Sequence, residues 1–534
     1  MDFQENDNEI FHKSEQKGND DFLTEDDTLN PKYSEGNTSF WGAFIQIGNT
    51  ILGAGIISLP VVIRYLGIIL GIVFIFIIAL LTIYSSYLLL KAHQITKKKK
   101  YSSIAHAAMG GKGYIFTNVM IILNNFGLSA VYFRIFGDTI QNVIGGYVAK
   151  DSFLVTNWHN FLYIIIILIL MCFIIWTEDF EKFEKTSFLG MIGIIIYIIS
   201  LFILFFYKIY NGFSPFYSQE SLFINGEFTN ILISLPSVFL SFSFQFNLFP
   251  IYSGLIQRTH TEMLSVTEAS IAFCLILYVL SGVCGFLMYG GALNDTILFA
   301  FLTDMQDEKT DQFMKILLII ANVGFLTCST TSIPLVYYTL KQNFFSTYKY
   351  IIKKLNKKGK NIEMTNEDKK EEQEIDINSN NAINEGYDTD NSSVEENNEN
   401  HQENNNKINN NYNDIGRMDS IASIEGSMDD RVKKIKINVS RKEEIIISIF
   451  LYITIGIVTI LVPKLKSLFN IVGCTAANAI QFIIPSLIIV SLGERAKKLV
   501  NLFLAQLLLI FGIVSLIICL LAEIIHFLLL TLKN

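Results

Sequence analysis

Long apolar stretches recur along this 534-residue chain, and they limit its possible folds more than any other feature. Examples are Ile68–Leu90, Phe188–Tyr207 and Leu502–Leu530. A helix of about 20 apolar residues crosses a hydrocarbon core of ~30 Å, and it satisfies its own backbone hydrogen bonds inside lipid. Only 17% of the residues are charged, whereas soluble domains average about 25%. We therefore expect an all-α membrane protein.

We predict about eleven transmembrane helices, the third of which continues to about Gly145. The predicted spans cover residues 40–63, 66–91, 114–136, 160–177, 187–209, 230–253, 269–290, 314–340, 444–462, 467–491 and 498–530. The expected organisation is a disordered cytosolic tail over 1–39, helices one to eight over 40–341, a disordered cytosolic linker over 342–443 and helices nine to eleven over 444–534.

The tail and the linker are rich in Asn, Glu, Asp and Lys and poor in aromatic residues, so they bury too little apolar surface to fold. Most of the acidic residues of the chain lie in them. The net charge of −8 therefore indicates neither a nucleic-acid partner nor an acidic substrate. Ser420, Ser423 and Ser427 of the linker are either phosphorylation sites or part of low-complexity filler.

Basic residues gather at 97–100, 349–358 and 495–498, which share one side when eleven spans are threaded. By the positive-inside rule this side is the cytosol, so the N-terminus is cytosolic and the C-terminus exoplasmic or lumenal. Asn294 then lies in an outer loop as a glycosylation acceptor. All six cysteines lie in apolar stretches, so we expect no disulfide framework.

Acidic and histidine side chains are almost absent from the middle of the predicted spans. Neither paired aspartates nor a Ser/His pair stands at membrane depth, so we expect no enzyme activity. A channel is disfavoured because the spans contain no motif that would form a ring-shaped selectivity filter. The informative residues are instead glycines, prolines and hydroxyl-bearing side chains.

Glycines and a proline interrupt the first span, at Gly53-Ala54-Gly55 and Pro60. Glycine weakens a helix and proline removes a backbone donor, so we expect the helix to break here. Broken backbone inside a membrane persists where it is buried or faces an aqueous cavity. The freed N–H groups of Gly53, Ala54 and Gly55 would bind a carboxylate. Alternatively, the glycines form a helix-packing face.

The sixth span has prolines towards both ends, Pro236 and Pro250, and polar residues at its centre. Two interrupted spans, the first and the sixth, indicate a transporter built from inverted repeats with a binding site near the bilayer midplane. Spans one to five and six to ten would be the two repeats, and the eleventh would be an addition.

The two interrupted spans carry a specific pair of motifs. These are Asn49-x-x-x-Gly53-x-Gly55-Ile56-x-x-Leu59-Pro60 in span one, and Phe242-x-Phe244-Gln245 with Pro250-Ile251-Tyr252 in span six. With them the membrane portion resembles the amino acid/auxin permease family of the APC superfamily. That family includes sodium-coupled neutral amino acid transporters and vacuolar amino acid transporters. Weaker matches are Tyr132 with Gly137-Asp138 in span three, and Gly473-Cys474-Thr475 with Pro485 in span ten.

The resemblance implies a leucine-transporter-type fold, a 5+5 inverted repeat plus one extra helix, with substrate between spans one, three, six and eight. The break at Gly53, Ala54 and Gly55 would take the carboxylate of an amino acid, and Tyr132 would help close the pocket. The amino group would bind at the break of span six, where the implied substrate-binding residues are Ser241, Phe242, Ser243, Phe244 and Gln245.

In sodium-coupled members of the family, a cation binds between span one and hydroxyl groups of span eight. The resemblance assigns Asn49, Thr331 and Ser332 to such a site, and their oxygen atoms suit a hard cation. Alternatively, the hydroxyls only bond to carbonyls of their own helix. Gln245 replaces a His of many sodium-coupled members, and Gln does not titrate. We expect no cofactor beyond a coupling ion, Na+ or H+.

Charged side chains near the span ends leave alternatives open. Arg134 in span three either influences substrate choice or forms an i,i+4 salt bridge with Asp138 near the outer face. Glu523 and His526 are one turn apart in span eleven, where snorkelling or local pairing is favoured over a proton relay.

These features predict a secondary active transporter that moves amino acids across a membrane by alternating access, as a monomer in the lipid bilayer. The coupling gradient is of H+ or Na+, and the membrane is the plasma membrane or a vacuolar or lysosomal membrane. The alternative is a membrane amino-acid sensor that has the same pocket and no net flux. The amino acid and the direction of flux stay open.

Overall fold

The computed structural model describes most of the predicted membrane portion. The described residues are 36–145, 147–148, 165, 182–211, 223–225, 227–293, 295–308, 310–384, 441–462 and 465–533. Contacts divide them into a membrane unit, which comprises the residues up to Phe345 and from Ile445, and a second unit between Ser346 and Glu444.

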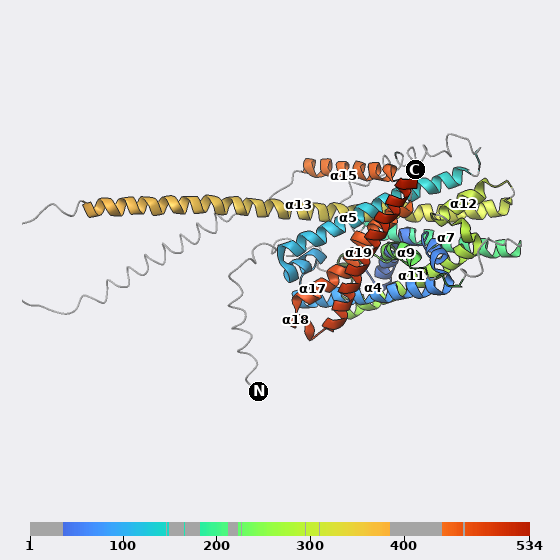
Figure 1. Cartoon of the computed structure of the whole chain (residues 1–534), viewed down its shortest axis with the longest axis horizontal. Helices are drawn as coiled ribbons and strands as arrows, with labels where there is room; N and C mark the ends of the chain where they lie inside the picture. Colours follow the sequence, from blue (N-terminus) through green and yellow to red (C-terminus); the bar gives the residue numbers. More distant parts are fainter. Residues whose placement is uncertain are drawn as a thin grey trace, which may run out of the picture. The chain divides into compact units, whose positions relative to one another are not determined.

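Nine helices in the described part of the chain are long and apolar enough to cross a membrane, and a bent pair makes up to ten (Figure 1). The bent pair is α2 (Phe40–Gly55) and α3 (Leu59–Leu66), which meet at 60°. The others are α4 (Ile68–Thr96), α5 (Tyr101–Gly145), α7 (Lys182–Tyr210), α9 (Phe228–Ser241) with α10 (Gln245–Gly254), α11 (His260–Tyr289), α13 (Gln312–Asn384), α15 (Arg441–Leu461), α16 (Leu465–Val472) with α17 (Ile484–Leu492), and α19 (Leu502–Lys533).

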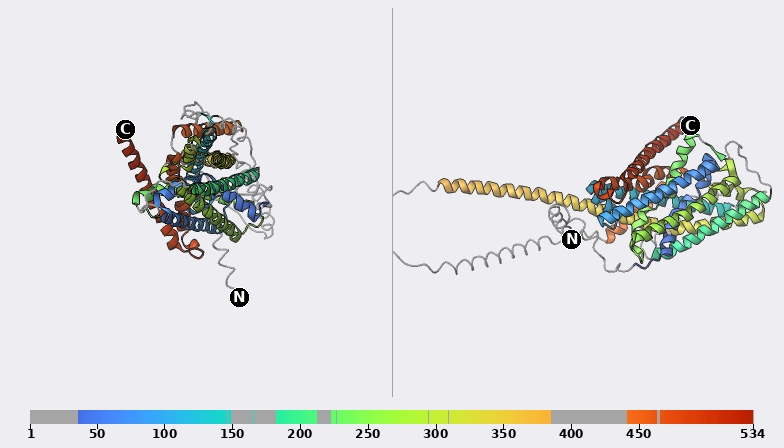
Figure 2. Two further views of the ribbon diagram at one scale, coloured as in Figure 1. Left: turned by 90° about the vertical axis from the view of Figure 1, so that its right-hand side faces the viewer. Right: turned by 90° about the horizontal axis from the view of Figure 1, so that it is seen from below.

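Every predicted span except the fourth corresponds to one of these helices, so the all-α membrane fold is confirmed. The fourth, over 160–177, lies outside the described residues except for residue 165. The helices of the membrane unit pack side by side as a bundle (Figure 2), and α11 contacts α2, α3 and α4. Large apolar side chains remain exposed along α4 and α19, as a lipid-facing surface requires; they include Ile69, Val73, Phe76, Phe503, Leu507 and Ile510.

A short helix, α12 (Ile297–Gln306), joins α11 to α13 and was not predicted from the sequence. Its apolar side chains Leu298 and Phe301 are buried. Asp304 fixes it to two long helices, because Lys208 of α7 lies 2.7 Å away and the Tyr289 hydroxyl of α11 donates to it at 2.7 Å. Its 10 residues are too few to span a membrane, so α12 covers one end of the bundle's helices instead.

Helix α13 continues to Asn384, well past the predicted end of span eight near 341. The polar continuation is rich in Lys and Glu and contains no Pro, and these residues favour a helix. The structure therefore describes the first part of the expected linker, up to Asn384, as helix. Residues 385–440 of the linker, with the three candidate phosphorylation serines, lie outside the described residues.

Three glycines allow two close helix contacts in the membrane unit. A Cβ on Gly193 of α7 would collide with the Gly324 carbonyl of α13, and a Cβ on Gly324 would lie 2.7 Å from the Gly193 carbonyl. Gly473 opens the π-helical segment Gly473–Ala477 and lies against the backbone of Pro236 in α9. These contacts set the spacing of the helices that surround the two interrupted spans.

Candidate functional site

The first span breaks where the glycines predicted it. Gly53 has φ −36° and ψ −106°, outside the helical range, and the chain resumes as α3 with Pro60 in its first turn. At the end of α2, the Gly55 carbonyl accepts the Ser58 N–H at 3.0 Å and the Ser58 hydroxyl at 2.8 Å. The break is buried, since Gly53, Ala54 and Gly55 are all buried.

Tyr132 of α5 lies directly against this break. A Cβ on Gly53 would collide with the Tyr132 hydroxyl oxygen, so a side chain at this position would have to displace Tyr132. The same hydroxyl interacts with the backbone of Ala54 and with the Ser332 hydroxyl of α13. Spans one, three and eight therefore meet at Gly53, as the predicted pocket requires.

The second break lies between α9, which ends at Ser241, and α10, which begins at Gln245. The Phe242 N–H donates to the Val238 carbonyl at 3.2 Å, and the side-chain oxygen of Gln245 accepts the Phe244 N–H at 3.1 Å. The predicted substrate ligand Gln245 therefore satisfies the broken backbone. Two buried polar atoms here, Gln245 Nε2 and Ser243 Oγ, have no hydrogen-bond partner among the described residues.

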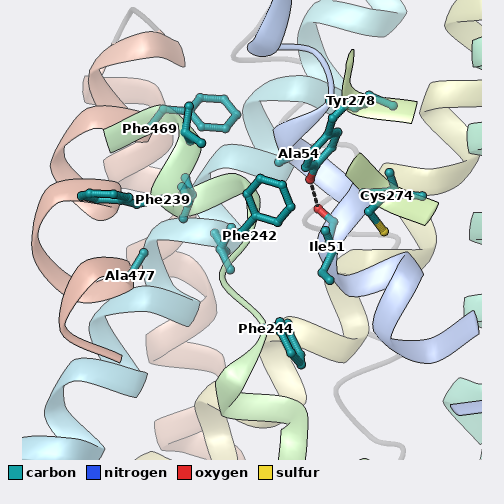
Figure 3. Close-up of a cluster of buried hydrophobic side chains, with 14 of the residues drawn as sticks. Ile51, Ala54, Phe239, Phe242, Phe244, Cys274, Tyr278, Phe469 and Ala477 are labelled. Carbon is teal, nitrogen blue, oxygen red and sulfur yellow. Dashed lines mark hydrogen bonds between the residues drawn. The ribbon is translucent and has the colours of Figure 1, made fainter. Parts of the chain in front are cut away.

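The two breaks face each other. A Cβ on Gly55 would lie 2.6 Å from the Ser241 Cβ and 2.7 Å from its Cα, so the two backbones approach as closely as glycine allows. Figure 3 shows Phe242 beside Ile51 and Ala54, whereas Phe244 lies farther along the chain towards α10. The structure thus brings Gly53, Ala54, Gly55, Tyr132, Ser241 and Phe242 together.

A small pocket adjoins both breaks on the side where α3 and α16 approach α9. Ser58 follows the first break and Ser237 precedes the second by one turn. Lys466 lies at the edge of the pocket, where its ammonium donates to the Tyr65 hydroxyl at 2.8 Å and its backbone N–H donates to Asp295 at 2.8 Å. The remaining lining residues are Val61, Val62, Ile233, Ser234 and Phe469.

Tyr278 of α11 is a residue of the breaks that the sequence did not indicate. Its buried hydroxyl lies 2.5 Å from the Ile51 carbonyl of the first span and 2.7 Å from the Ser241 carbonyl of the sixth. Figure 3 shows its hydroxyl pointing at the Ile51 carbonyl. The one signal in the sequence is the helical spacing of polar side chains at Ser270, Cys274, Tyr278 and Ser281.

These four residues form a row of donors along α11, which we call the α11 ladder. The Ser270 hydroxyl lies 3.3 Å from the Phe44 carbonyl, the Cys274 thiol 3.9 Å from the Gly48 carbonyl and the Ser281 hydroxyl 3.3 Å from the Ile56 carbonyl. With the Tyr278 bond, the ladder holds α11 against the first span on both sides of its break.

The residues predicted to bind a cation also come together. A Cβ on Gly190 of α7 would lie 2.5 Å from Asn49 Oδ1 and 2.6 Å from Thr331 Oγ1, so both oxygens face the same point. Both polar atoms of the Asn49 side chain are buried and have no hydrogen-bond partner in the described part of the chain. Such an orphaned amide fits a site for a hydrogen-bonding or ionic ligand.

The hydroxyl protons of this region bond to their own helix. Thr331 donates to the Thr327 and Cys328 carbonyls at 3.0 and 2.9 Å, and Ser332 donates to the Cys328 carbonyl at 2.9 Å. Each hydroxyl oxygen still has lone-pair capacity to accept, so these bonds are compatible with either alternative. Among the described side chains, no group of three or more His, Cys, Asp or Glu residues is arranged to hold a metal ion.

The charged side chains near the span ends form pairs with neighbouring side chains. Arg134 Nε lies 3.1 Å from the Asp138 carboxylate, which is the i,i+4 salt bridge. Glu523 accepts a hydrogen bond from the Asn470 amide of α16. The His526 side chain lies outside the described residues, as do Asn294 and Cys172. The five described cysteines are buried and form no disulfide with one another.

Comparison with known proteins identifies the family. Residues 36–527 match the family described as "Transmembrane amino acid transporter protein". The chain belongs to this family. It is 22% identical over 320 residues to the amino acid transporter AVT6E of Arabidopsis thaliana, which covers 58% of this chain and 64% of that protein. It is also 22% identical over 330 residues to the sodium-coupled neutral amino acid symporter 2 of Danio rerio, again over 58% and 64%.

The fold has solved counterparts. The crystal structure of MhsT in complex with L-phenylalanine superposes with a TM-score of 0.51 and 11% identity, over 91% of this chain and 99% of that chain. The leucine-transporter-type fold and the resemblance to amino acid permeases are therefore confirmed. The chain matches less than two thirds of the length of AVT6E and of the Danio rerio symporter.

Proposed function

We propose that this member of the amino acid transporter family is a secondary active transporter that moves amino acids by alternating access, without a catalytic step and as a monomer. The observation that carries the proposal is the contact between the two breaks, where Gly55 lies against Ser241 and Tyr132 lies against Gly53. Interrupted helices that meet in the interior provide backbone donors from one break and backbone acceptors from the other. An amino acid carries a carboxylate and an ammonium group that match these two kinds of partner.

Each part of the substrate then has a partner. The carboxylate binds the N–H groups at Gly53, Ala54 and Gly55, and the ammonium group binds carbonyls of the Ser241–Phe244 segment. Ser243 and Gln245 still have unpartnered polar atoms there. The ring of Phe242 borders the space for the substrate side chain. Tyr132 closes the pocket from α5.

The coupling ion would be Na+ or H+. For Na+, the proposed ligands are Asn49, Thr331 and Ser332, supported by the orphaned Asn49 amide opposite Thr331. One relative is named as a sodium-coupled symporter, which favours Na+. The proposed orientation has a cytosolic N-terminus, in the plasma membrane or a vacuolar or lysosomal membrane.

The test is uptake of a labelled amino-acid mixture into proteoliposomes under an imposed Na+ or pH gradient. The variants are Gly53→Val, which drives a side chain into Tyr132, and Gly254→Ala, a control in α10 where the new Cβ would meet only Thr38, at 3.3 Å or more. Gradient-driven uptake by wild type and Gly254→Ala, lost in folded Gly53→Val, supports the transporter and identifies the ion. Saturable amino-acid binding without uptake under either gradient would overturn transport in favour of a sensor.

A further inference from the structure

Two carbonyl oxygens from different helices converge on one atom in the interior of the bundle. They belong to Ile51, which precedes the irregular Gly53, and to Ser241, the last residue of α9. The Ile51 carbonyl lies one turn before the end of α2, where the helix is irregular. The Ser241 carbonyl, at the C-terminus of α9, lacks an intrahelical donor and needs another partner. The Tyr278 hydroxyl is that partner, at 2.5 and 2.7 Å.

A pair of converging carbonyl oxygens is also the kind of group that replaces the hydration shell of a small cation. A hydroxyl has a single proton, which serves two acceptors less well than a positive ion does. We propose that the Tyr278 hydroxyl takes the place of a cation between the two breaks. Wild type then needs no ion at this point, and Tyr278 limits the number of cations that accompany the substrate.

The surroundings of Tyr278 allow its hydroxyl to be removed while the ring stays packed in place. Its ring lies edge-on against Phe242, with centroids 5.1 Å apart and an interplanar angle of 81°. Cys274 and Ser281, the neighbouring residues of the α11 ladder, keep α11 in register with the first span without the Tyr278 hydroxyl. The change Tyr278→Phe therefore keeps the packed ring and leaves two buried carbonyls facing a space the size of one oxygen.

The consequence for ion coupling rests on the proposed transport function, but the binding itself does not. The experiment therefore measures the melting temperature Tm of purified protein while NaCl replaces choline chloride at constant ionic strength. Thr331→Ala is present throughout, because it weakens the separate candidate site at Asn49. Tyr337→Phe is the matched control, since that buried tyrosine also donates to a backbone carbonyl, of Ser448, at 2.5 Å.

We expect Thr331→Ala alone and Thr331→Ala/Tyr337→Phe to show no saturable response to Na+. Thr331→Ala/Tyr278→Phe should gain one, a rise in Tm of about 2–5 °C at saturation, because the ion binds only the folded protein. With Thr331 intact, the dependence of uptake on Na+ concentration should be steeper for Tyr278→Phe than for Tyr337→Phe, because a second cation then accompanies the substrate.

Two results would overturn the proposal. The first is a folded Thr331→Ala/Tyr278→Phe protein whose Tm is as insensitive to Na+ as that of the Tyr337→Phe control. The second is a saturable Na+ response in Thr331→Ala that persists when Asn49 is also changed to Ala, because the hydroxyl would then not exclude the ion. The second result can be read even if Tyr278→Phe does not fold. Both results are Tm measurements that do not involve uptake. They therefore test the role of Tyr278 independently of the transport proposal.

Discussion

The two interrupted spans break by different physical means. The first breaks through small residues, since Gly53 and Gly55 make room for Tyr132 and Ser241. The second contains no glycine between Phe242 and Phe244, and the side chain of Gln245 supplies the acceptor that the backbone lacks. The first break should therefore be sensitive to added volume, and the second to the loss of one hydrogen-bonding atom.

The largest expected effect is at Gly55. Gly55→Ala would place a Cβ 2.6 Å from the Ser241 Cβ, and overpacking at a site that positions substrate should lower the initial uptake rate about tenfold or more. Ser241→Gly in the same protein should restore part of the rate by removing that Cβ. Rescue should be incomplete, since the Ser241 Cα still lies 2.7 Å away. Wild-type uptake by Gly55→Ala would contradict a steric role of this break.

An intermediate effect is expected at Gln245. Gln245→Met keeps the length of the side chain but leaves the buried Phe244 N–H without its acceptor. The free energy of unfolding should fall by about 1–3 kcal/mol, measured as a lowered Tm in detergent. Ser241→Ala is the control, because that hydroxyl only donates back to the Ser237 carbonyl of its own helix. Equal effects of the two changes would mean that the second break does not depend on Gln245.

The smallest effect is expected at Ser58. Ser58→Ala removes the hydroxyl bond to the Gly55 carbonyl, but that carbonyl keeps the Ser58 N–H at 3.0 Å. A loss of about 0.5–1 kcal/mol should follow, visible as a small shift of Tm with unchanged uptake. A destabilisation as large as that of Gln245→Met would show that the first break also depends on a side-chain hydrogen bond, and the contrast between the two would disappear.

The sequence predicted the location of the first break because glycine and proline act on the backbone locally. Gly53, Gly55 and Pro60 weaken the helix whatever surrounds them. The second break lies at the polar centre of span six, away from Pro236 and Pro250. The approach of the breaks to each other, and of Tyr132 to Gly53, was implied only by resemblance to a known family. Contacts of this kind depend on the packing of distant helices, which local patterns do not encode.

The features that the sequence missed depend on those same distant contacts. Tyr278 stands in an apolar span, where a tyrosine usually indicates packing, and its role depends on carbonyls of two other helices. The bond of the Gln245 oxygen to the adjacent backbone was missed as well, because this geometry exists only once the helix has broken. The helix α12 was missed because its apolar run is short.

The α11 ladder bears on how proteins of this kind can diverge. Every acceptor in it is a main-chain carbonyl, at Phe44, Gly48, Ile51 and Ile56, and a main-chain oxygen is present whatever side chain the residue carries. Side chains of the first span other than Gly53 and Gly55 can therefore change, and with them the chemistry of the pocket, while its alignment with α11 persists. Efforts to alter the substrate range should begin with the pocket side chains of α2 and leave the donor face of α11 untouched.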